Sequence, residues 1–474
     1  MLKNFLKTAW RNIIRHKGNT AINVIGLALG MTCCLFIFLW VRDEKNIDNF
    51  HTKGENIFTA YQTIKANGKT DGTYQTPVRV VDGHNYMPLE DAKQFIPEIK
   101  AEAFYATGYE LPWGHLETIQ VGEKKLKLEG SRAGEEFFKI FSYPLLQGNA
   151  ETALKNMHGI AISHNMANIY FGSPANAMGK SVRYENRLDF IVTAVFENLT
   201  KESSLHFDFL LNWEAQKNIL EWSSPETRVH FLLAKNADPV VVEKKLTRFL
   251  AGRMDNNPDY ETKIGLQRFG DQYLQNIFVN GKPLAGRIEY VRIFTGVAIF
   301  ILIIACINFM NLATARSVKR AKEVGLRKVV GSSRRALIGQ FFCESISFSF
   351  LAMLLAILLF YLLLPAFNQF TGKAISYPDI HPGFWLTLTA LMVVTGIVAG
   401  SYPALYLSSL QPIRVLKGVA RFTKGSVFFR SGLTVFQFVL STVLIIATIV
   451  IYRQTNYTQH VHLGYNRDNL IYIR

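Results

Sequence analysis

The sequence predicts an α-helical membrane protein with about five transmembrane helices and a large α+β domain inserted between the first two. Of the 474 residues, 49% are hydrophobic. Apolar runs occupy residues 22–41, 294–312, 346–364, 384–407 and 433–452. A helix of about 20 residues is long enough to cross roughly 30 Å of hydrocarbon. The mostly polar stretch 42–292 has about 250 residues, enough to bury a core of its own.

The charge distribution predicts which side of the membrane each segment faces. The formal net charge is +16, and the basic excess lies in residues 3–17, 316–335 and 414–430. These segments hold 18 lysines and arginines and one glutamate, whereas the rest of the chain holds 34 basic and 35 acidic residues. Five crossings that start inside would place all three segments in the cytoplasm, as the positive-inside rule requires. Nucleic acid is excluded as a partner because no soluble unit is basic.

Residues 1–17 predict an amphipathic helix on the cytoplasmic face of the membrane. Their apolar side chains share one face of a helix, and their lysines and arginines lie on the other. Trp10 suits the level of the lipid headgroups. Two interpretations stay open: the helix contacts lipid alone, or it also flanks a docking site for a cytoplasmic partner.

Small residues in the first and fourth spans indicate close helix packing. Gly26 and Gly30 stand four residues apart in the first span, and Gly396 and Gly400 do so in the fourth. This spacing lets two helix backbones approach each other. Pro403 follows, and we expect it to kink the fourth span near its inner end.

The inserted stretch 42–292 has the pattern of an α+β domain. Asn67-Gly68 and Asn280-Gly281 are signals of hairpin turns. Strands are expected at 126–128 and 190–196, and helices at 88–100 and 134–141. All four cysteines lie in or beside apolar runs, so no disulfide framework is expected here.

The most informative stretch is the basic connector 316–340 between the second and third spans. Apolar residues from Val318 to Val329 recur at helical intervals, and Gly331 can end that helix in a left-handed conformation. The connector either fixes topology and touches anionic lipid, or docks a cytoplasmic partner. The ordered motif within it favours docking. The candidate docking residues are Arg316, Lys319, Lys322, Glu323, Val324, Gly325, Arg327, Lys328 and Gly331.

The sequence carries no signature of catalysis or metal binding. Gly179-Lys180-Ser181 lacks the earlier glycine that a phosphate-binding loop requires, because Pro174 stands at that position. The eleven histidines are scattered and match no metal motif. Glu344, at the start of the third span, either complements the helix dipole or relays protons. We therefore expect a non-catalytic chain without a cofactor or metal of its own.

Three sets of residues resemble the MacB/FtsX-type permeases, the membrane subunits of ABC systems that include macrolide exporters, lipoprotein-release permeases and cell-division FtsX. The connector motif (residues 322–331 with Gln340 to Ser345) resembles the loop after their second span. Residues 137–148 and 162–182 resemble the MacB-like periplasmic core domain, and 396–417 resemble the last span of a repeat. The resemblance implies that an ATPase grips the connector.

The resemblance also implies the function, partners and location of the chain. It would be a permease subunit in a bacterial inner membrane, with a cytoplasmic N-terminus and with residues 42–292 outside the cytoplasm. A separate cytoplasmic ABC ATPase dimer would bind the ATP and drive the external domain, a mechanism called mechanotransmission. Other expected partners are membrane lipids, a second permease copy or repeat, and a periplasmic adaptor or hydrolase.

Two questions stay open after this comparison. The cargo could be a peptide, a lipoprotein or a drug. The alternative functions are an FtsX-like permease that regulates an envelope hydrolase and a membrane sensor with an external ligand domain.

The last part of the chain repeats the layout of the first. Residues 414–432 predict a cytoplasmic linker, 433–452 a fifth span, and 453–474 the start of a second extracytoplasmic domain. Asn469-Leu470-Ile471 echoes Asn56-Ile57-Phe58. We interpret the chain as one complete repeat followed by the opening of a second, as in family members with two repeats, of which this would be a truncated form.

Overall fold

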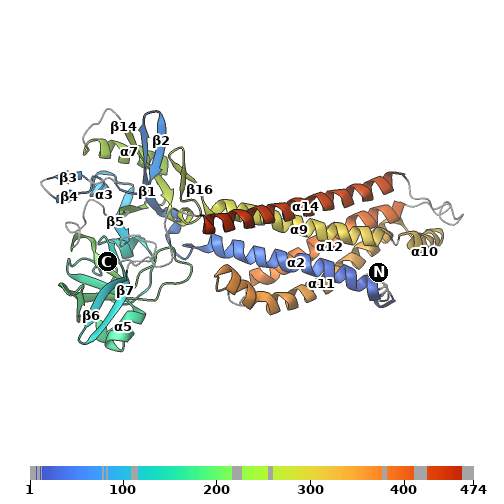
Figure 1. Cartoon of the computed structure of the whole chain (residues 1–474), viewed down its shortest axis with the longest axis horizontal. Coiled ribbons are helices and arrows are strands. Elements are labelled where there is room, and N and C mark those ends of the chain that lie inside the picture. Colours follow the sequence, from blue (N-terminus) through green and yellow to red (C-terminus); the bar gives the residue numbers. More distant parts are fainter. Residues whose placement is uncertain are drawn as a thin grey trace. The chain divides into compact units, whose positions relative to one another are not determined.

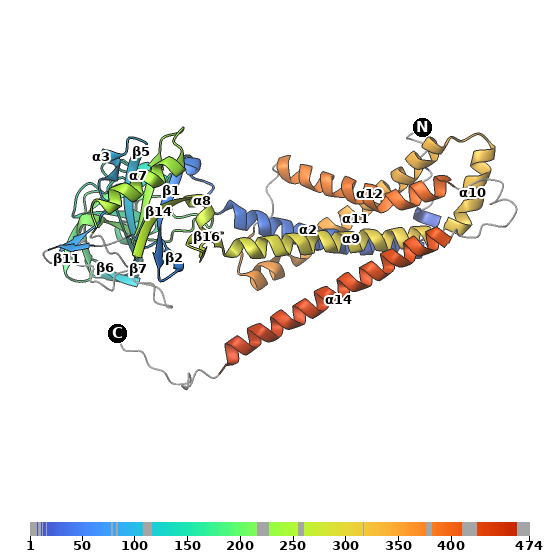
Figure 2. The ribbon, with the colours of Figure 1, turned by 90° about the horizontal axis from the view of Figure 1, so that it is seen from above.

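The computed structural model describes two compact units of the chain (Figures 1 and 2). The membrane unit comprises Met1–Val41 and Ile293–Arg474, and the external unit comprises Arg42–Arg292. The described residues are Lys7, Arg11, 13–15, 17–76, 79–81, 84–107, 116–215, 227–254, 260–315, 317–375, 382–409 and 424–461. Most of the predicted N-terminal helix, Arg316, residues 414–423 and the predicted strand near Leu470 lie outside this description.

Five helices in the described chain are long and apolar enough to cross a membrane, in agreement with the five apolar runs. They are α2 (Lys17–Asn46), α9 (Arg287–Ala315), α11 (Arg334–Thr371), α12 (Pro382–Ser409) and α14 (Lys424–His460). A shorter helix, α10 (Ser317–Val329), lies between α9 and α11 in the chain. Buried apolar side chains of α2, α9, α11 and α12 form one core (Figure 1).

The helices extend beyond the apolar runs that predicted them. Helix α11 begins at Arg334, inside the predicted connector, because Ser333 caps it: the Ser333 hydroxyl accepts a hydrogen bond from the Ala336 amide at 3.3 Å. Helix α14 includes residues 424–432 of the predicted linker and 453–460 of the predicted second domain. Hydropathy locates only the apolar part of a helix, whereas polar residues continue it.

Helices α2 and α9 pack through the first pair of glycines. A Cβ atom added at Gly30 would lie 2.7 Å from the Cβ of Ala305, and one added at Gly26 would lie 3.3 Å from Nδ2 of Asn308. The Cys34 thiol also donates a hydrogen bond to the Ala298 carbonyl at 3.2 Å. The two backbones therefore approach too closely for a larger residue at Gly30.

Helices α11 and α12 pack in the same way through the second pair. A Cβ added at Gly400 would lie 2.7 Å from the Cβ of Ser345, and one at Gly396 would lie 3.0 Å from the Cα of Ile346. Helix α12 continues through Pro403 and ends at Ser409.

The external unit is built on a twelve-stranded sheet. Its strands are β1 (Ile57–Ala66), β2 (Lys69–Thr73), β5 (Ile99–Thr107), β6 (Leu116–Val121), β7 (Lys124–Ala133), β8 (Leu145–Gln147), β9 (Gly159–Ser163), β10 (Ser181–Tyr184), β11 (Leu188–Phe196), β12 (Phe209–Asn212), β13 (Thr227–Leu233) and β14 (Tyr260–Arg268). The order is β12-β9-β11-β10-β6-β7-β5-β13-β1-β14, with β2 on β1 and β8 on β11. Because β12 also pairs with β7, six strands form a closed ring.

Short elements complete the external unit. Two further hairpins are β3 (Arg79–Val81) with β4 (His84–Tyr86) and β15 (Ile277–Val279) with β16 (Lys282–Ala285). The helices are α3 (Ala92–Phe95), α4 (Phe137–Ile140), α5 (His164–Phe171), α6 (Pro174–Ala177), α7 (Pro239–Ala251) and α8 (Phe269–Gln272), with 3-10 turns at Gly54–Asn56 and Trp213–Ala215. Helix α7 packs on β14 (Figure 1).

The local predictions for the external unit are mostly confirmed. Both hairpin turns are present, with positive φ at Asn67, Gly68, Asn280 and Gly281 as a type I′ turn requires. The strands at 126–128 and 190–196 lie within β7 and β11. The helix at 88–100 is wrong beyond Ala92–Phe95, because Pro97 follows and Ile99 already pairs with β13. The helix at 134–141 shortens to Phe137–Ile140.

Two buried histidines sit in an aromatic core of this unit. The rings of His51 and His230 both lie within 5.6 Å of Phe141 and Phe269, measured between centroids. His51 accepts a hydrogen bond at Nδ1 from the Ser142 amide, and His230 Nδ1 lies 2.9 Å from the Thr59 hydroxyl. Burial lowers the pKa of His51 to about 4 and that of His230 to about 3.

We expect these histidines to make the chain less stable as the pH falls. Both stay neutral when folded, whereas the unfolded chain takes up protons below about pH 6.5. Their stabilising contribution is therefore complete above pH 6.5 and is lost as the pH approaches 4. Thermal unfolding of the purified chain between pH 7.5 and 5 should show a smaller decrease of the midpoint for His51→Gln than for the wild type.

The variant serves as the control for other titrating groups. Burial raises the pKa of Glu102 to about 7, and this shift acts in the opposite direction, since it stabilises the folded chain at lower pH. Glu102 contributes equally to both proteins, so it cancels in the comparison. Equal midpoint decreases in the wild type and His51→Gln would contradict the assignment.

Close packing of α11 and α12 makes Gly400 sensitive to substitution. Gly400→Val should reduce stability by about 1–3 kcal/mol, the usual cost of overpacking. Gly296→Val in α9 is the matched control, because a Cβ there meets nothing within 4 Å. Thermal unfolding in detergent measures both, and equal midpoints for the two variants would show that the contact is not tight.

Candidate coupling site

Helix α10 and the turn after it form the centre of the site. The turn satisfies the helix end through two backbone hydrogen bonds, from Ser332 to the Arg327 carbonyl at 2.9 Å and from Gly331 to the Lys328 carbonyl at 3.1 Å. This is the Schellman pattern, and Gly331 supplies the positive φ of 97° that it needs. Because Ser333 then starts α11, helices α10 and α11 are joined by a short, fully bonded turn.

One face of α10 is seated on α11 and α12 by apolar contacts. Val324 is only 4% exposed and clusters with Leu337 and Phe341 of α11 and with Ala404 and Leu407 of α12. Burying a valine side chain contributes roughly 1.5–3 kcal/mol. Gly325 next to it is also buried. The apolar seat is therefore the main attachment of α10.

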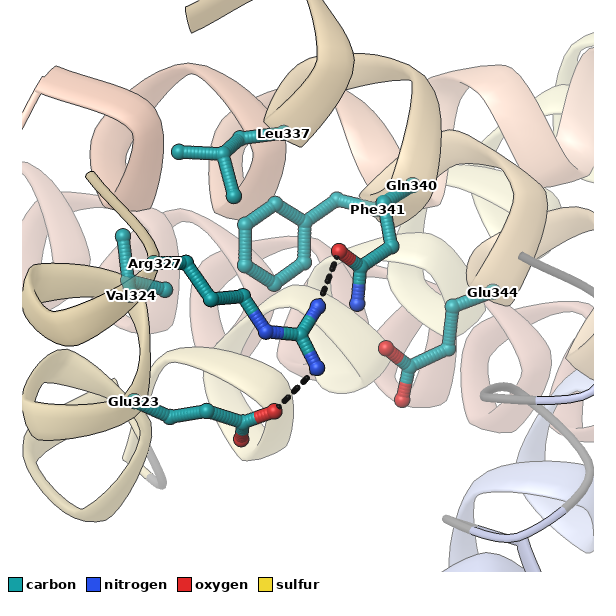
Figure 3. Close-up of a pocket in the computed structure, with 7 residues that line it drawn as sticks. All are labelled: Glu323, Val324, Arg327, Leu337, Gln340, Phe341 and Glu344. Carbon is teal, nitrogen blue, oxygen red and sulfur yellow. Dashed lines mark hydrogen bonds and ion pairs between the residues drawn. The ribbon is translucent and has the colours of Figure 1, made fainter. Parts of the chain in front are cut away.

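Polar contacts fix the orientation of the seated helix (Figure 3). The Arg327 guanidinium donates to Oε1 of Gln340 at 2.5 Å and to Oε1 of Glu323 at 2.6 Å. Lys328 donates from Nζ to the Ser408 carbonyl at 2.7 Å. Burial and the nearby charge of Arg334 lower the pKa of Lys328. These contacts tie α10 to α11 through Arg327 and to α12 through Lys328.

A small cavity of about 10 Å³ lies between α10 and α11. Figure 3 shows that Arg327 lies across it, with Glu344 of α11 on the far side of Gln340. Glu344 is buried. The space is close to the minimum that holds one water molecule, so it is not a substrate pocket. In the described part of the chain, no cluster of histidine, cysteine, aspartate or glutamate could hold a metal ion.

The opposite face of α10 and its turn is exposed and partly apolar. Leu326 is 59% exposed, Val329 62% and Val330 80%. Glu323 is exposed beside them. Apolar side chains that cluster on an outer surface often mark a site of protein association.

The structure thus brings together part of the predicted docking set. Glu323, Val324, Arg327 and Lys328 make the contacts above, and Gly331 shapes the turn. Lys319 and Lys322 lie in α10, but their side chains, like all of Arg316, fall outside the described residues.

Sequence reasoning missed the acceptors of the seat and its exposed apolar residues. Gln340 and Ser408 accept the hydrogen bonds of Arg327 and Lys328, but they lie 13 and 80 residues away in the chain. Gln340 had drawn notice only as part of a motif. For Leu326, the available signal was its position opposite Val324 on a helix.

Comparison with known families accounts for most of the chain. The family described as "MacB-like periplasmic core domain" matches residues 20–249, and the family described as "FtsX-like permease C-terminal" matches residues 295–412. The second match contains all of α10, the turn and α11.

Curated relatives match the chain over most of its length. A protein named "Macrolide export ATP-binding/permease protein MacB" from Mannheimia succiniciproducens is 19% identical over 410 residues, which cover 85% of this chain and 59% of that protein. The protein of the same name from Bdellovibrio bacteriovorus is 32% identical over 126 residues, 26% of this chain and 19% of that protein. Where the match is long, the chain spans about three fifths of the relative's length.

Solved structures resemble part of the chain. A permease domain from Porphyromonas gingivalis matches with a TM-score of 0.37 and 16% identity over 46% of this chain and 92% of that one. The periplasmic region of MacB from Actinobacillus actinomycetemcomitans matches with a TM-score of 0.29 and 15% identity over 44% and 88%. Taken with five membrane-crossing helices and an extracytoplasmic domain, the two family matches show that the chain belongs to the MacB/FtsX-type permeases of ABC transport systems.

Proposed function

We propose that this chain is a permease subunit that converts ATP hydrolysis by a separate cytoplasmic ABC ATPase dimer into movement of its external unit. The two-sided arrangement of α10 carries the proposal. Its inner face is fixed to α11 and α12 by Val324 and Arg327, and its outer face leaves Leu326 and Val330 exposed. A helix seated on the spans and open on the other side can receive force from a bound protein.

The chain offers a short path from α10 to the external unit. Only Arg316 separates the end of α9 at Ala315 from the start of α10 at Ser317. Helix α9 begins at Arg287, within the external unit, and α2 packs against α9 through Gly30. A displacement of α10 would therefore act on α9 first and on α2 through their contact.

Two observations favour an ATPase on another chain. The sequence contains no phosphate-binding loop of the nucleotide type. The family matches cover periplasmic and permease domains, whereas the curated relatives are named as ATP-binding and permease proteins in one. The basic segments beside the spans support a cytoplasmic N-terminus and a cytoplasmic α10.

Charges on the exposed face of α10 should block ATPase docking. Leu326→Asp/Val330→Asp places two carboxylates at the contact, and we expect co-purification with the cognate ABC ATPase to fall at least tenfold. Residues at the centre of an interface each cost about 2 kcal/mol or more when lost. The measurement is co-purification of the tagged chain with candidate ATPases of its own genome in mild detergent.

Val240→Asp is the matched control for docking. Val240 is 54% exposed, but it lies on α7 of the external unit. This variant should bind the ATPase like the wild type, and all three proteins should unfold at similar temperatures. Undiminished ATPase recovery with the double variant would contradict docking through α10.

Loss of the Arg327 contacts should loosen the seat of α10 without removing its exposed face. Arg327→Met should accelerate amide hydrogen exchange in residues 323–333 several-fold and reduce stimulation of the ATPase, while the ATPase still binds. Arg335→Met is the control, because Arg335 is exposed and forms no hydrogen bond or ion pair with any described residue. Identical exchange rates in both variants would show that Arg327 does not hold the helix.

A further inference from the structure

A polar cavity of about 530 Å³ lies wholly within the external unit, away from the coupling site. One wall comes from the end of α2 and the segment after it, from Lys45 to Glu55. The other comes from the end of β14 and from α8, from Arg268 to Leu274. Volumes between about 300 and 1,000 Å³ are typical of small-molecule sites.

Two buried side chains on this wall have unsatisfied polar atoms. Asp48 is 2% exposed, and its Oδ1 accepts a hydrogen bond from the Ser204 amide at 2.8 Å, but its Oδ2 has no partner. His51 is 5% exposed and accepts at Nδ1 from Ser142, so the proton of its neutral ring is on Nε2, which has no partner either. Buried polar groups without partners are costly, and a bound ligand commonly satisfies them.

The exposed charges around the cavity have both signs and do not neutralise each other. Lys45 and Arg268 are cationic, and Glu55 and Asp271 are anionic. None of the four forms an ion pair with a described residue. With Asp48, the cavity therefore offers carboxylates to a cation and, separately, an ammonium, a guanidinium and a ring N–H to an anion. Such a lining suits a zwitterion better than a simple ion of either sign.

The position of the cavity along the chain points to the lipid headgroup layer. Lys45 lies in the last turn of α2, four residues beyond the apolar run that ends at Val41. At 1.5 Å per residue this is about 6 Å of helix. The headgroup region on each side of the hydrocarbon core is about as thick, roughly 5–7 Å.

We propose that this cavity binds a phosphoethanolamine group, with its ammonium on Asp48 and its phosphate on Arg268 and Lys45. The source is a membrane lipid headgroup or the free molecule, which share this chemistry. A primary ammonium can donate hydrogen bonds to the Asp48 carboxylate, whereas the trimethylammonium of phosphocholine cannot. Occupancy of the cavity is independent of ATPase docking.

The test uses the full-length chain in a maltoside detergent. Titration calorimetry measures the affinity for O-phosphoethanolamine and for O-phosphocholine. In parallel, the chain is reconstituted into phosphatidylcholine bilayers containing one fifth phosphatidylethanolamine, extracted again, and analysed for retained lipid by native mass spectrometry. The variants are Asp48→Asn and Arg268→Gln, with Asp189→Asn on exposed β11 as the control.

We expect preferential binding of phosphoethanolamine and at least tenfold weaker binding by Asp48→Asn, with Asp189→Asn unchanged. Retention of the lipid without binding of the free molecule assigns a lipid site, and binding of the free molecule assigns a soluble ligand. Arg268→Gln, at an exposed position, should weaken binding about fivefold and guards against a folding defect in Asp48→Asn. No saturable binding of either form, or equal binding by both Asp variants, would overturn the proposal.

Discussion

The contact between α2 and α9 is the interaction on which the rest of the structure depends. The external unit is one continuous insert, Arg42–Arg292, so the chain enters it through α2 and leaves it through α9. Gly30 lets the two helices touch at Ala305, and Asn308 lies against Gly26. A larger side chain at Gly30 would separate the two connections between membrane and insert. Motion carried by one helix is therefore shared by the other.

The attachment of α10 rests more on packing than on charge. The Glu323–Arg327 pair is partly exposed and spans one helical turn, and such pairs contribute about 0.3–0.5 kcal/mol. Burial of Val324 contributes several times more. The dense basic charge that makes this stretch conspicuous in the sequence is thus not what holds it. Basic side chains there remain available for topology, lipid or a partner.

Sequence patterns located the spans, the insert and both hairpin turns, because apolar length and Asn-Gly turn chemistry are local properties. They placed the start of α11 too late, since the cap at Ser333 extends the helix through polar residues. They could not pair Arg327 with Gln340 or bring Arg268 near Asp48, because these meetings depend on tertiary packing. The cavity in the external unit escaped notice for that reason: its two walls are more than two hundred residues apart in the sequence.

Site-specific photo-crosslinking in native membranes tests the central claim most directly. A benzophenone amino acid replaces Val330 on the exposed turn after α10 or, as a reference, Leu362, which is 66% exposed on membrane helix α11. The account predicts that the probe at position 330 crosslinks to an ABC ATPase, and that the probe at position 362 does not. Crosslinks from position 330 to lipid alone would contradict it and leave α10 as a topological anchor.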